Sequence, residues 1–203
     1  MIIGPEYKIA RRLGAPVFEK TQTQKYVLSQ ARKEKTGKSF MRPKSEYGIQ
    51  LLEKQKARYT YCLTEKQFSK YAKEALSKKG AHGASKLFES LELRADNVAY
   101  RAGFAPTRLA SRQLISHGHM MVNGKRITIP SMKLFLDDVI SIRGASVSKP
   151  LFATLEERLK TFTPPSWIQF NAEKKEAKIQ GMPKYQGGDS LFDIHAILEF
   201  YSR

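Results

Sequence analysis

The stretch TRLASRQLISHGHMMVNG, residues 107–124, combines side chains that bind anions with side chains that bind metals. Arg108, Arg112 and Ser116 follow one another at intervals of four, which places them within about 80° on one side of a helix. Gln113 lies beside them, and no carboxylate occurs within this helix to pair with the arginines. Because guanidinium groups match phosphate oxygens in a two-point geometry, the pattern predicts a phosphate-binding row.

Local signals set the limits of this helix and predict a hairpin after it. Thr107 is a favoured N-cap, whose helix end also offers N–H groups to an anion, and Gly118 suits the first position after a helix. Asn123-Gly124 between two short runs is the strongest short-range hairpin signal, and residues 139–142 alternate as a strand. The pattern over residues 92–145 therefore predicts two helices followed by a small antiparallel sheet.

The histidines of this stretch indicate neither a metal site nor catalysis. His117 and His119 flank the helix-ending glycine, so we expect their side chains to diverge. The other two histidines, His82 and His195, lie far away in the sequence, and Cys62 alone cannot supply a Cys-rich zinc site. We find no Ser-His-Asp order and no Gly-rich phosphate loop. The sequence therefore predicts no cofactor, no metal and no enzymatic activity.

The charge balance indicates an anionic partner. The chain of 203 residues carries 36 Lys and Arg against 19 Asp and Glu, a formal net charge of +17. Residues 1–80 account for +12 of this charge and residues 81–203 for +5. The cations are interspersed with tyrosine, glutamine and glycine, which favours a nucleic acid over a membrane surface. No run approaches the roughly 20 apolar residues of a membrane span.

The rest of the chain divides by its sequence pattern. Residues 1–44 contain scattered glycines, prolines and cations without a lasting apolar period, which predicts either a disordered tail or an extended basic arm that orders on an anionic partner. Thr64 and Gln67 form a capping box before an apolar stripe, so residues 45–91 predict helices. Further along we expect a short helix, two strands that pair across the turn at 171–175, and a terminal helix.

A family resemblance joins these parts. At residues 95–131, ADNVAYRAGFAPTRLASRQLISHGHMMVNGKRITIPS resembles the S-four RNA-binding domain, named after the fourth protein of the small ribosomal subunit. The flanks resemble bacterial S-four itself, in Tyr47-Gly48-x-Gln50-Leu51 and in the closing Glu199-x-Tyr201-Ser202. Order and spacing agree over residues 45–203, and the chain is identified as a member of this ribosomal protein family. The four amino-terminal cysteines that hold zinc in many relatives are not present, so no zinc ribbon is expected.

The resemblance implies a mixed α+β fold in three parts. They are a mainly helical domain, an inserted region, and an extended basic amino-terminal arm. The inserted region begins with the S-four domain, as two helices packed on a small antiparallel sheet, and continues with a helix and a hairpin. The ranges are 45–91 plus 189–203 for the helical domain, 92–188 for the inserted region with the S-four domain at about 92–150, and 1–44 for the arm.

The resemblance also implies a function. Members of the family are structural constituents of the small ribosomal subunit that bind its ribosomal RNA at a junction of helices, nucleate assembly of the subunit body and influence translational accuracy. The expected partners are that RNA, the fifth and twelfth small-subunit proteins, and the nearby entry path of the messenger RNA. The expected location is the cytoplasmic ribosome, without a membrane.

Candidate RNA contacts combine the predicted row with further cations and one aromatic ring. In the inserted domain they are Arg101, Arg108, Arg112, Gln113, Ser116, His117, Lys125 and Arg126. In the helical domain and just before it they are Arg42, Lys44, Lys54, Lys56, Arg58 and Tyr59. Such side chains suit a folded RNA, which proteins recognise mainly through backbone and shape.

Two other functions remain open. One is a stand-alone S-four-domain regulator that binds RNA, and the other is an accessory module of an RNA-modifying enzyme such as a pseudouridine synthase. Only 58 residues follow position 145, too few for a separate catalytic domain, and a free module would lack the helical region at 45–90. A DNA-binding helix-turn-helix is disfavoured, because the glycine stop and the hairpin leave no long recognition helix.

Overall fold

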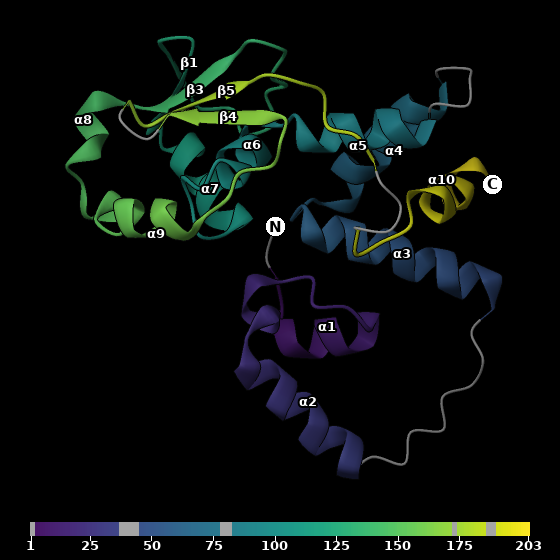
Figure 1. Ribbon diagram of the computed structural model, residues 1–203. Coiled ribbons are helices and arrows are strands. Elements are labelled where there is room, and N and C mark those ends of the chain that lie inside the picture. The colour runs from purple at the N-terminus through teal and green to yellow at the C-terminus, as the bar shows by residue number, and fades with distance from the viewer. Residues whose placement is uncertain (1–2, 37–44, 78–82, 172–173, 186–189) are drawn as a thin grey trace. The chain divides into compact units, whose positions relative to one another are not determined.

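The computed structural model describes residues 3–36, 45–77, 83–171, 174–185 and 190–203 (Figure 1). The chain folds into two compact units, one made of Met1–Leu87 with Tyr185–Arg203 and the other of Phe88–Lys184. In the described residues the first unit is helical, whereas the second combines helices with an antiparallel sheet. The mixed α+β class is therefore confirmed. Arg42 and Lys44, two of the predicted RNA contacts, lie outside the described residues.

The expectation of an extended amino-terminal arm is wrong for residues 6–36. This segment forms helix α1 (Glu6–Leu13), the 3-10 turn η1 (Glu19–Gln22) and helix α2 (Gln24–Thr36). Leu13 and Phe18 are buried, and Leu52 and Tyr59 of helix α3 (Glu46–Thr60) pack against their cluster. The apolar residues of the segment are irregularly spaced and form a core only together with α3, so the sequence shows no lasting period.

The first unit contains further helices that share a core. They are α3, α4 (Glu65–Ser77), α5 (Gly83–Glu92), which continues into the second unit, and α10 (Ile194–Ser202). Thr64 Oγ1 accepts from the N–H of Gln67 at 3.3 Å, and Gln67 Oε1 accepts from the N–H of Thr64 at 3.4 Å, which confirms the capping box. Ile194 and Ile197 of α10 are buried where this helix packs on α3 and α4. Segments from both ends of the chain thus form one core.

The second unit carries a five-stranded antiparallel sheet in the order β2-β1-β3-β5-β4. Its strands are β1 (Met120–Val122), β2 (Lys125–Ile127), β3 (Val139–Ile142), β4 (Ile168–Asn171) and β5 (Glu176–Ile179). Both predicted hairpins are confirmed, because Val122 pairs with Lys125 and Phe170 pairs with Ala177. The second hairpin also joins the first one in a single sheet, since Ile140 of β3 pairs with Ala177 of β5.

Helices lie on one side of this sheet (Figure 1). They are α6 (Ala95–Arg101), α7 (Arg108–Ser116) and α9 (Leu155–Thr161), with α8 (Gly144–Val147) and the turn η2 (Pro150–Phe152) between β3 and α9. Met120, Ile140 and Ile179 of the strands are fully buried in one cluster with Val98 of α6 and Ile115 of α7. Burial of each such side chain contributes about 1.5–3 kcal/mol, so this core holds α6 and α7 in place.

Candidate nucleic-acid interface

Helix α7 begins and ends where its sequence signals predict. Thr107 Oγ1 accepts a hydrogen bond from the N–H of Ala110 at 3.0 Å, as an N-cap does. At the other end Gly118 has a φ of +70°, and its N–H donates to the carbonyl of Ile115 at 2.7 Å. The predicted helix is therefore confirmed at both ends.

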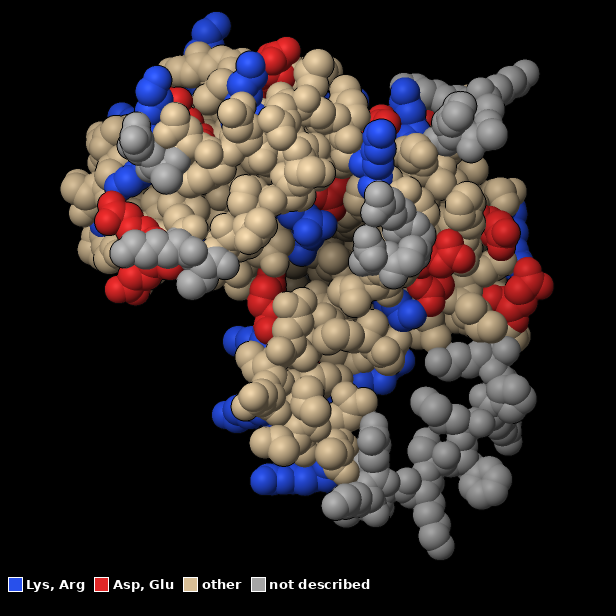
Figure 2. Space-filling model, in the orientation of Figure 1, with Lys and Arg blue, Asp and Glu red and all other residues tan. Residues whose placement is uncertain are grey.

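Basic side chains are spread over the visible surface of the second unit (Figure 2). On this face acidic side chains gather near α9, which carries the exposed Glu156 and Glu157. Exposed cations of the unit include Lys125, Arg126, Arg143 and Lys149. A group of arginines lies partly below the surface, where α6 meets α7.

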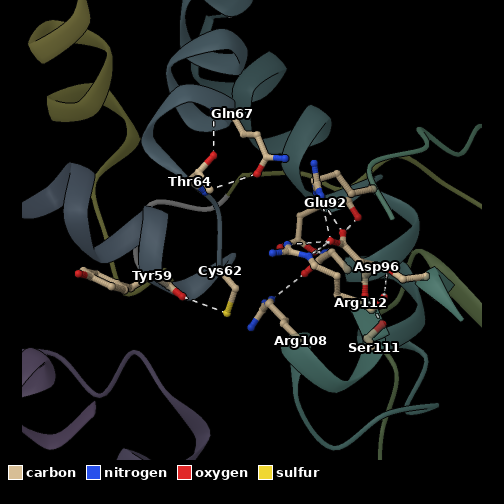
Figure 3. A network of polar contacts seen from close by, with 12 residues as sticks. Tyr59, Cys62, Thr64, Gln67, Glu92, Asp96, Arg108, Ser111 and Arg112 are labelled. Atoms are coloured by element: carbon tan, nitrogen blue, oxygen red, sulfur yellow. Dashed lines mark hydrogen bonds and ion pairs between the residues drawn. The ribbon is translucent and has the colours of Figure 1, made fainter. Parts of the chain in front are cut away.

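Two arginines of the predicted row are held by partners within the unit (Figure 3). Arg112 donates from Nε and Nη2 to Oδ2 of Asp96, at 2.9 and 2.8 Å. Arg108 donates from Nε to Oδ1 of Asn97 at 2.8 Å, and its guanidinium lies 4.4 Å from the ring centre of Tyr100. The expectation of a row without an acidic partner is therefore wrong, because the acid comes from α6, 16 residues before Arg112.

Two further arginines complete the group. Arg94 donates from Nε and Nη2 to the two carboxylate oxygens of Asp96, at 3.0 and 2.9 Å. Glu92 accepts from Nε and Nη2 of Arg101, both at 3.0 Å, and from Nδ2 of Asn97 at 2.8 Å. We call these residues the arginine network: Glu92, Arg94, Asp96, Asn97, Arg101, Arg108 and Arg112. These seven residues comprise four guanidinium groups, two carboxylates and one amide.

Burial divides the arginine network into an inner part and a part that reaches solvent. The side chains of Glu92, Arg94 and Asp96 are only 1–4% exposed. The side chain of Arg101 is 37% exposed and that of Arg112 is 21% exposed. Arg101 and Arg112 therefore keep surface on which an anion can bind, whereas Arg94 supports Asp96 from inside.

Further predicted contacts lie at the carboxyl end of α7 and on the neighbouring hairpin. The exposed ones are Gln113, Ser116, His117, Lys125 and Arg126. Ser116 Oγ donates back to the carbonyl of Arg112 at 2.9 Å. Nη2 of Arg126 lies 3.5 Å from the carbonyl of His117, so the hairpin and the end of α7 form one polar surface.

Gly118 is the residue that allows this approach. A Cβ at this position would run into the guanidinium of Arg126, and the φ of +70° is strained for other residues. We expect Gly118→Ala to lower the free energy of unfolding by about 1–2 kcal/mol, the cost of a left-handed conformation for an L-residue. Urea titration followed by the fluorescence of Trp167, the only tryptophan, measures this change.

The control for this substitution is Gly144→Ala, because a Cβ at Gly144 meets nothing within 4 Å and its φ is not positive. Its effect should stay within about 0.5 kcal/mol. Equal midpoints for the two variants would show that Gly118 is not constrained by its conformation or by Arg126.

His119 lies in a cationic cluster that the sequence analysis did not identify. Its ring centre is 6.1 Å from that of His117, with 28° between the ring planes, so the expected divergence is wrong. Its Nδ1 lies 3.0 Å from Oγ of Ser146. Partial burial lowers the pKa of His119 below its ordinary value, and neighbouring positive charges lower it further. The contributing side chains are Lys149, His117, Arg126 and Arg143.

This lowered pKa predicts a pH dependence of stability. As the pH falls below the ordinary histidine pKa of 6.5, the unfolded chain binds a proton at this residue before the folded chain does. We therefore expect the free energy of unfolding of the second unit to fall between about pH 7.5 and 5.5. Urea titrations with Trp167 fluorescence at a series of pH values measure the slope.

His119→Gln should flatten this slope, whereas His195→Gln, in the first unit, should leave it unchanged. An equally steep slope in His119→Gln would assign the pH dependence to another group.

No set of three or more His, Cys, Asp or Glu side chains in the described ranges is arranged to hold a metal ion.

In the first unit Lys54 does not lie on the surface. Its side chain is 8% exposed, and its Nζ pairs with Glu65 at 2.9 Å and lies 4.3 Å from the ring centre of Phe200. Burial alone would raise the pKa of Glu65, but the hydrogen bonds from Tyr201 and Lys54 outweigh it, so this pKa is lowered. The assumption that Lys54 is a surface cation is wrong, because α10 covers it.

The other described candidates of this unit are half-buried on α3. Lys56 pairs with Glu53 at 2.7 Å, and the guanidinium of Arg58 lies 4.4 Å from the ring centre of Tyr59. Tyr59 in turn packs edge-on against Phe18, with ring centres 5.8 Å apart. RNA contacts by Lys56, Arg58 and Tyr59 stay predictions.

Comparisons with known proteins cover both units. The ribosomal protein S4/S9 N-terminal domain matches residues 1–92, and the S4 domain matches residues 93–148. The small ribosomal subunit protein uS4c of Euglena longa is 41% identical over 203 residues, which cover 99% of this chain and 97% of that protein. The chain belongs to the uS4 family of small ribosomal subunit proteins.

Bacterial uS4 proteins give the same result. The uS4 protein of Herpetosiphon aurantiacus is 39% identical over 207 residues, covering 98% of each chain, and that of Syntrophomonas wolfei is 43% identical over 159 residues, covering 78% of this chain and 76% of that protein. The family resemblance seen in the sequence motifs is thus confirmed. The border between the two matched uS4 regions falls inside the arginine network, after Glu92.

Among the helices of the described ranges, none combines the length and the hydrophobicity that a membrane crossing requires.

Proposed function

We propose that this uS4 family member is a structural constituent of the small ribosomal subunit, that it binds ribosomal RNA, and that it is not an enzyme. The observation that carries the proposal is the similarity over nearly the whole length to a relative named as a small ribosomal subunit protein, at 41% identity. The matches extend over residues 1–148 and so include the helical region that a stand-alone S-four module would lack.

Electrostatics supports RNA as the ligand. The chain carries a net charge of +17, and Arg101 and Arg112 of the arginine network reach solvent. Exposed cations at Lys125 and Arg126, and at Arg143 and Lys149, add to the charge of the second unit. Phosphate neutralisation with counterion release drives binding of such surfaces to nucleic acid, and backbone and shape contacts suit folded RNA.

The proposal extends to the kind of RNA and to its setting. A junction of helices brings phosphates of several RNA segments together, and a protein with cations on two units can offset their mutual repulsion. We therefore assign to the chain the binding of a ribosomal RNA helix junction, nucleation of the subunit body and a contribution to translational accuracy. The fifth and twelfth small-subunit proteins and the messenger entry path are the proposed neighbours.

Binding of the purified chain to a small-subunit ribosomal RNA fragment that contains the junction tests this function. We expect it to retain this fragment on filters at concentrations that leave an unrelated RNA of equal length and helix content unbound. In sedimentation we expect the chain to move with small subunits. Equal binding to both RNAs, with the chain left in the supernatant, would favour a free RNA-binding regulator instead.

A further inference from the structure

The arginine network has a feature that charge alone does not explain. Two carboxylates lie directly beneath the arginines that reach the surface, although carboxylates repel RNA. Asp96 Oδ2 accepts from Nε and Nη2 of Arg112 at 2.9 and 2.8 Å. Glu92 accepts from the same two atoms of Arg101, both at 3.0 Å. Each surface guanidinium is thus held at two points from within.

The carboxylates are themselves fixed from inside. Arg94 donates to both oxygens of Asp96, and the carboxylate side chain is 4% exposed. Asn97 donates from Nδ2 to Glu92, whose side chain is 1% exposed. Neither carboxylate can therefore turn to follow a moving arginine, and the planes of the two outer guanidinium groups are set by the packed interior.

A surface arginine normally samples many rotamers, and binding must restrict them. Restriction before binding removes that entropic cost for a ligand whose phosphates fit the fixed planes. It brings no such advantage for an RNA whose phosphates lie elsewhere. Fixed guanidinium planes therefore favour one arrangement of phosphates, whereas mobile cations favour any RNA.

We propose that Asp96 and Glu92 are positioning residues for RNA binding, which hold Arg112 and Arg101 in the orientation that selects a folded RNA. The inference rests on the proposed function. In this role the two buried acids contribute to the specificity of RNA binding, whereas an account based on net charge alone would count each of them as weakening RNA binding.

Asp96→Asn separates the two accounts. The substitution raises the net charge from +17 to +18, so charge alone predicts tighter binding to every RNA. We expect Asp96→Asn to bind the junction fragment up to about tenfold more weakly, the cost of ordering one long side chain on binding. Its affinity for the unrelated RNA should stay equal or rise. The measured quantity is the ratio of the two affinities.

Glu157→Gln is the matched control, because this exposed acid on α9 lies in the same unit and its loss changes the net charge equally. It should keep the wild-type ratio. Asp96→Asn binding the junction fragment as tightly as Glu157→Gln would overturn the inference. A wild-type chain that does not distinguish the two RNAs would overturn the proposed function, and the inference with it.

A second pair of variants conserves charge and spares the buried acids. Arg112→Lys keeps the positive charge but cannot form the two-point pair with Asp96, whereas Lys178→Arg conserves the charge of an exposed cation that Asp137 already balances in the same unit. We expect Arg112→Lys to lose up to about tenfold in affinity for the junction fragment only, the cost of ordering one long side chain on binding, and Lys178→Arg to lose little. Equal affinities of these two variants would overturn the inference.

The fluorescence of Trp167, which packs against the core of this unit, reports the folded fraction of each variant under the binding conditions. A role of Asp96 in folding alone would lower the affinity for both RNAs in proportion to the unfolded fraction. Positioning instead changes the ratio between the two RNAs in the folded protein.

Discussion

Replacing Asp96 with alanine is expected to lower the free energy of unfolding of the second unit by about 3–5 kcal/mol, as removal of one partner from a buried ion pair does. Asp96 is 3% exposed and accepts hydrogen bonds from Arg94 and Arg112. Without it, the guanidinium of Arg94, which is also 3% exposed, loses its carboxylate while it stays buried. Urea titration followed by Trp167 fluorescence measures the loss in this unit.

Glu156→Ala provides the control for this prediction. Glu156 also forms an ion pair, with Lys175 at 2.9 Å, but its side chain is 71% exposed. Exposed pairs of this kind contribute at most about 1 kcal/mol. If both variants unfolded at the same urea concentration, the arginine network would not stabilise the unit, and its buried carboxylates would need another explanation.

Elements with local signals could be predicted from the sequence. The N-cap at Thr107 and the left-handed Gly118 act within one helical turn, and they limit α7 in the structure as expected. The Asn123-Gly124 turn has φ values of +49° and +76°, which favour the twist of a tight hairpin. Each signal depends on the conformation of two or three residues, so it holds whatever packs against the element.

The surroundings of the candidate arginines could not be predicted in this way. Spacing by four shows that Arg108 and Arg112 share one side of a helix, but it does not show whether a second helix covers that side. Asp96 meets Arg112 because hydrophobic packing places α6 beside α7. In the same manner, the sequence alone suggests that Lys54 is a surface cation. In the structure, Phe200 of α10, from the other end of the chain, lies over its Nζ.

The order of the strands in the sheet could not be predicted from the sequence either. Alternation with a period of two identifies β3 as a strand, but it does not identify the neighbours of that strand in a sheet. The pairing of Ile140 with Ala177 joins the two hairpins across a long intervening segment. For this reason the sequence predicted two separate hairpins, and the structure has a single five-stranded sheet.

A second large effect is expected in RNA binding, through its dependence on salt. Raising the salt concentration from about 50 to 200 mM should weaken binding of the junction fragment roughly a thousandfold, as for proteins that neutralise about six phosphates. Cationic side chains that reach the surface of the second unit include Arg101, Arg112, Lys125, Arg126, Arg143 and Lys149. Filter binding over a series of KCl concentrations at constant Mg²⁺ gives the slope of log affinity against log salt.

Single substitutions apportion this slope among the side chains. Lys125→Gln and Arg126→Gln should each reduce it by about one, because each side chain neutralises one phosphate. Lys178→Gln is the matched control, since its Nζ pairs with Asp137 at 2.8 Å and its charge is already balanced. Unchanged slopes in the first two variants would exclude β2 from the interface, and a flat series for the wild type would exclude phosphate neutralisation as the source of affinity. A steep wild-type slope that falls only in the β2 variants would place the hairpin against the RNA backbone.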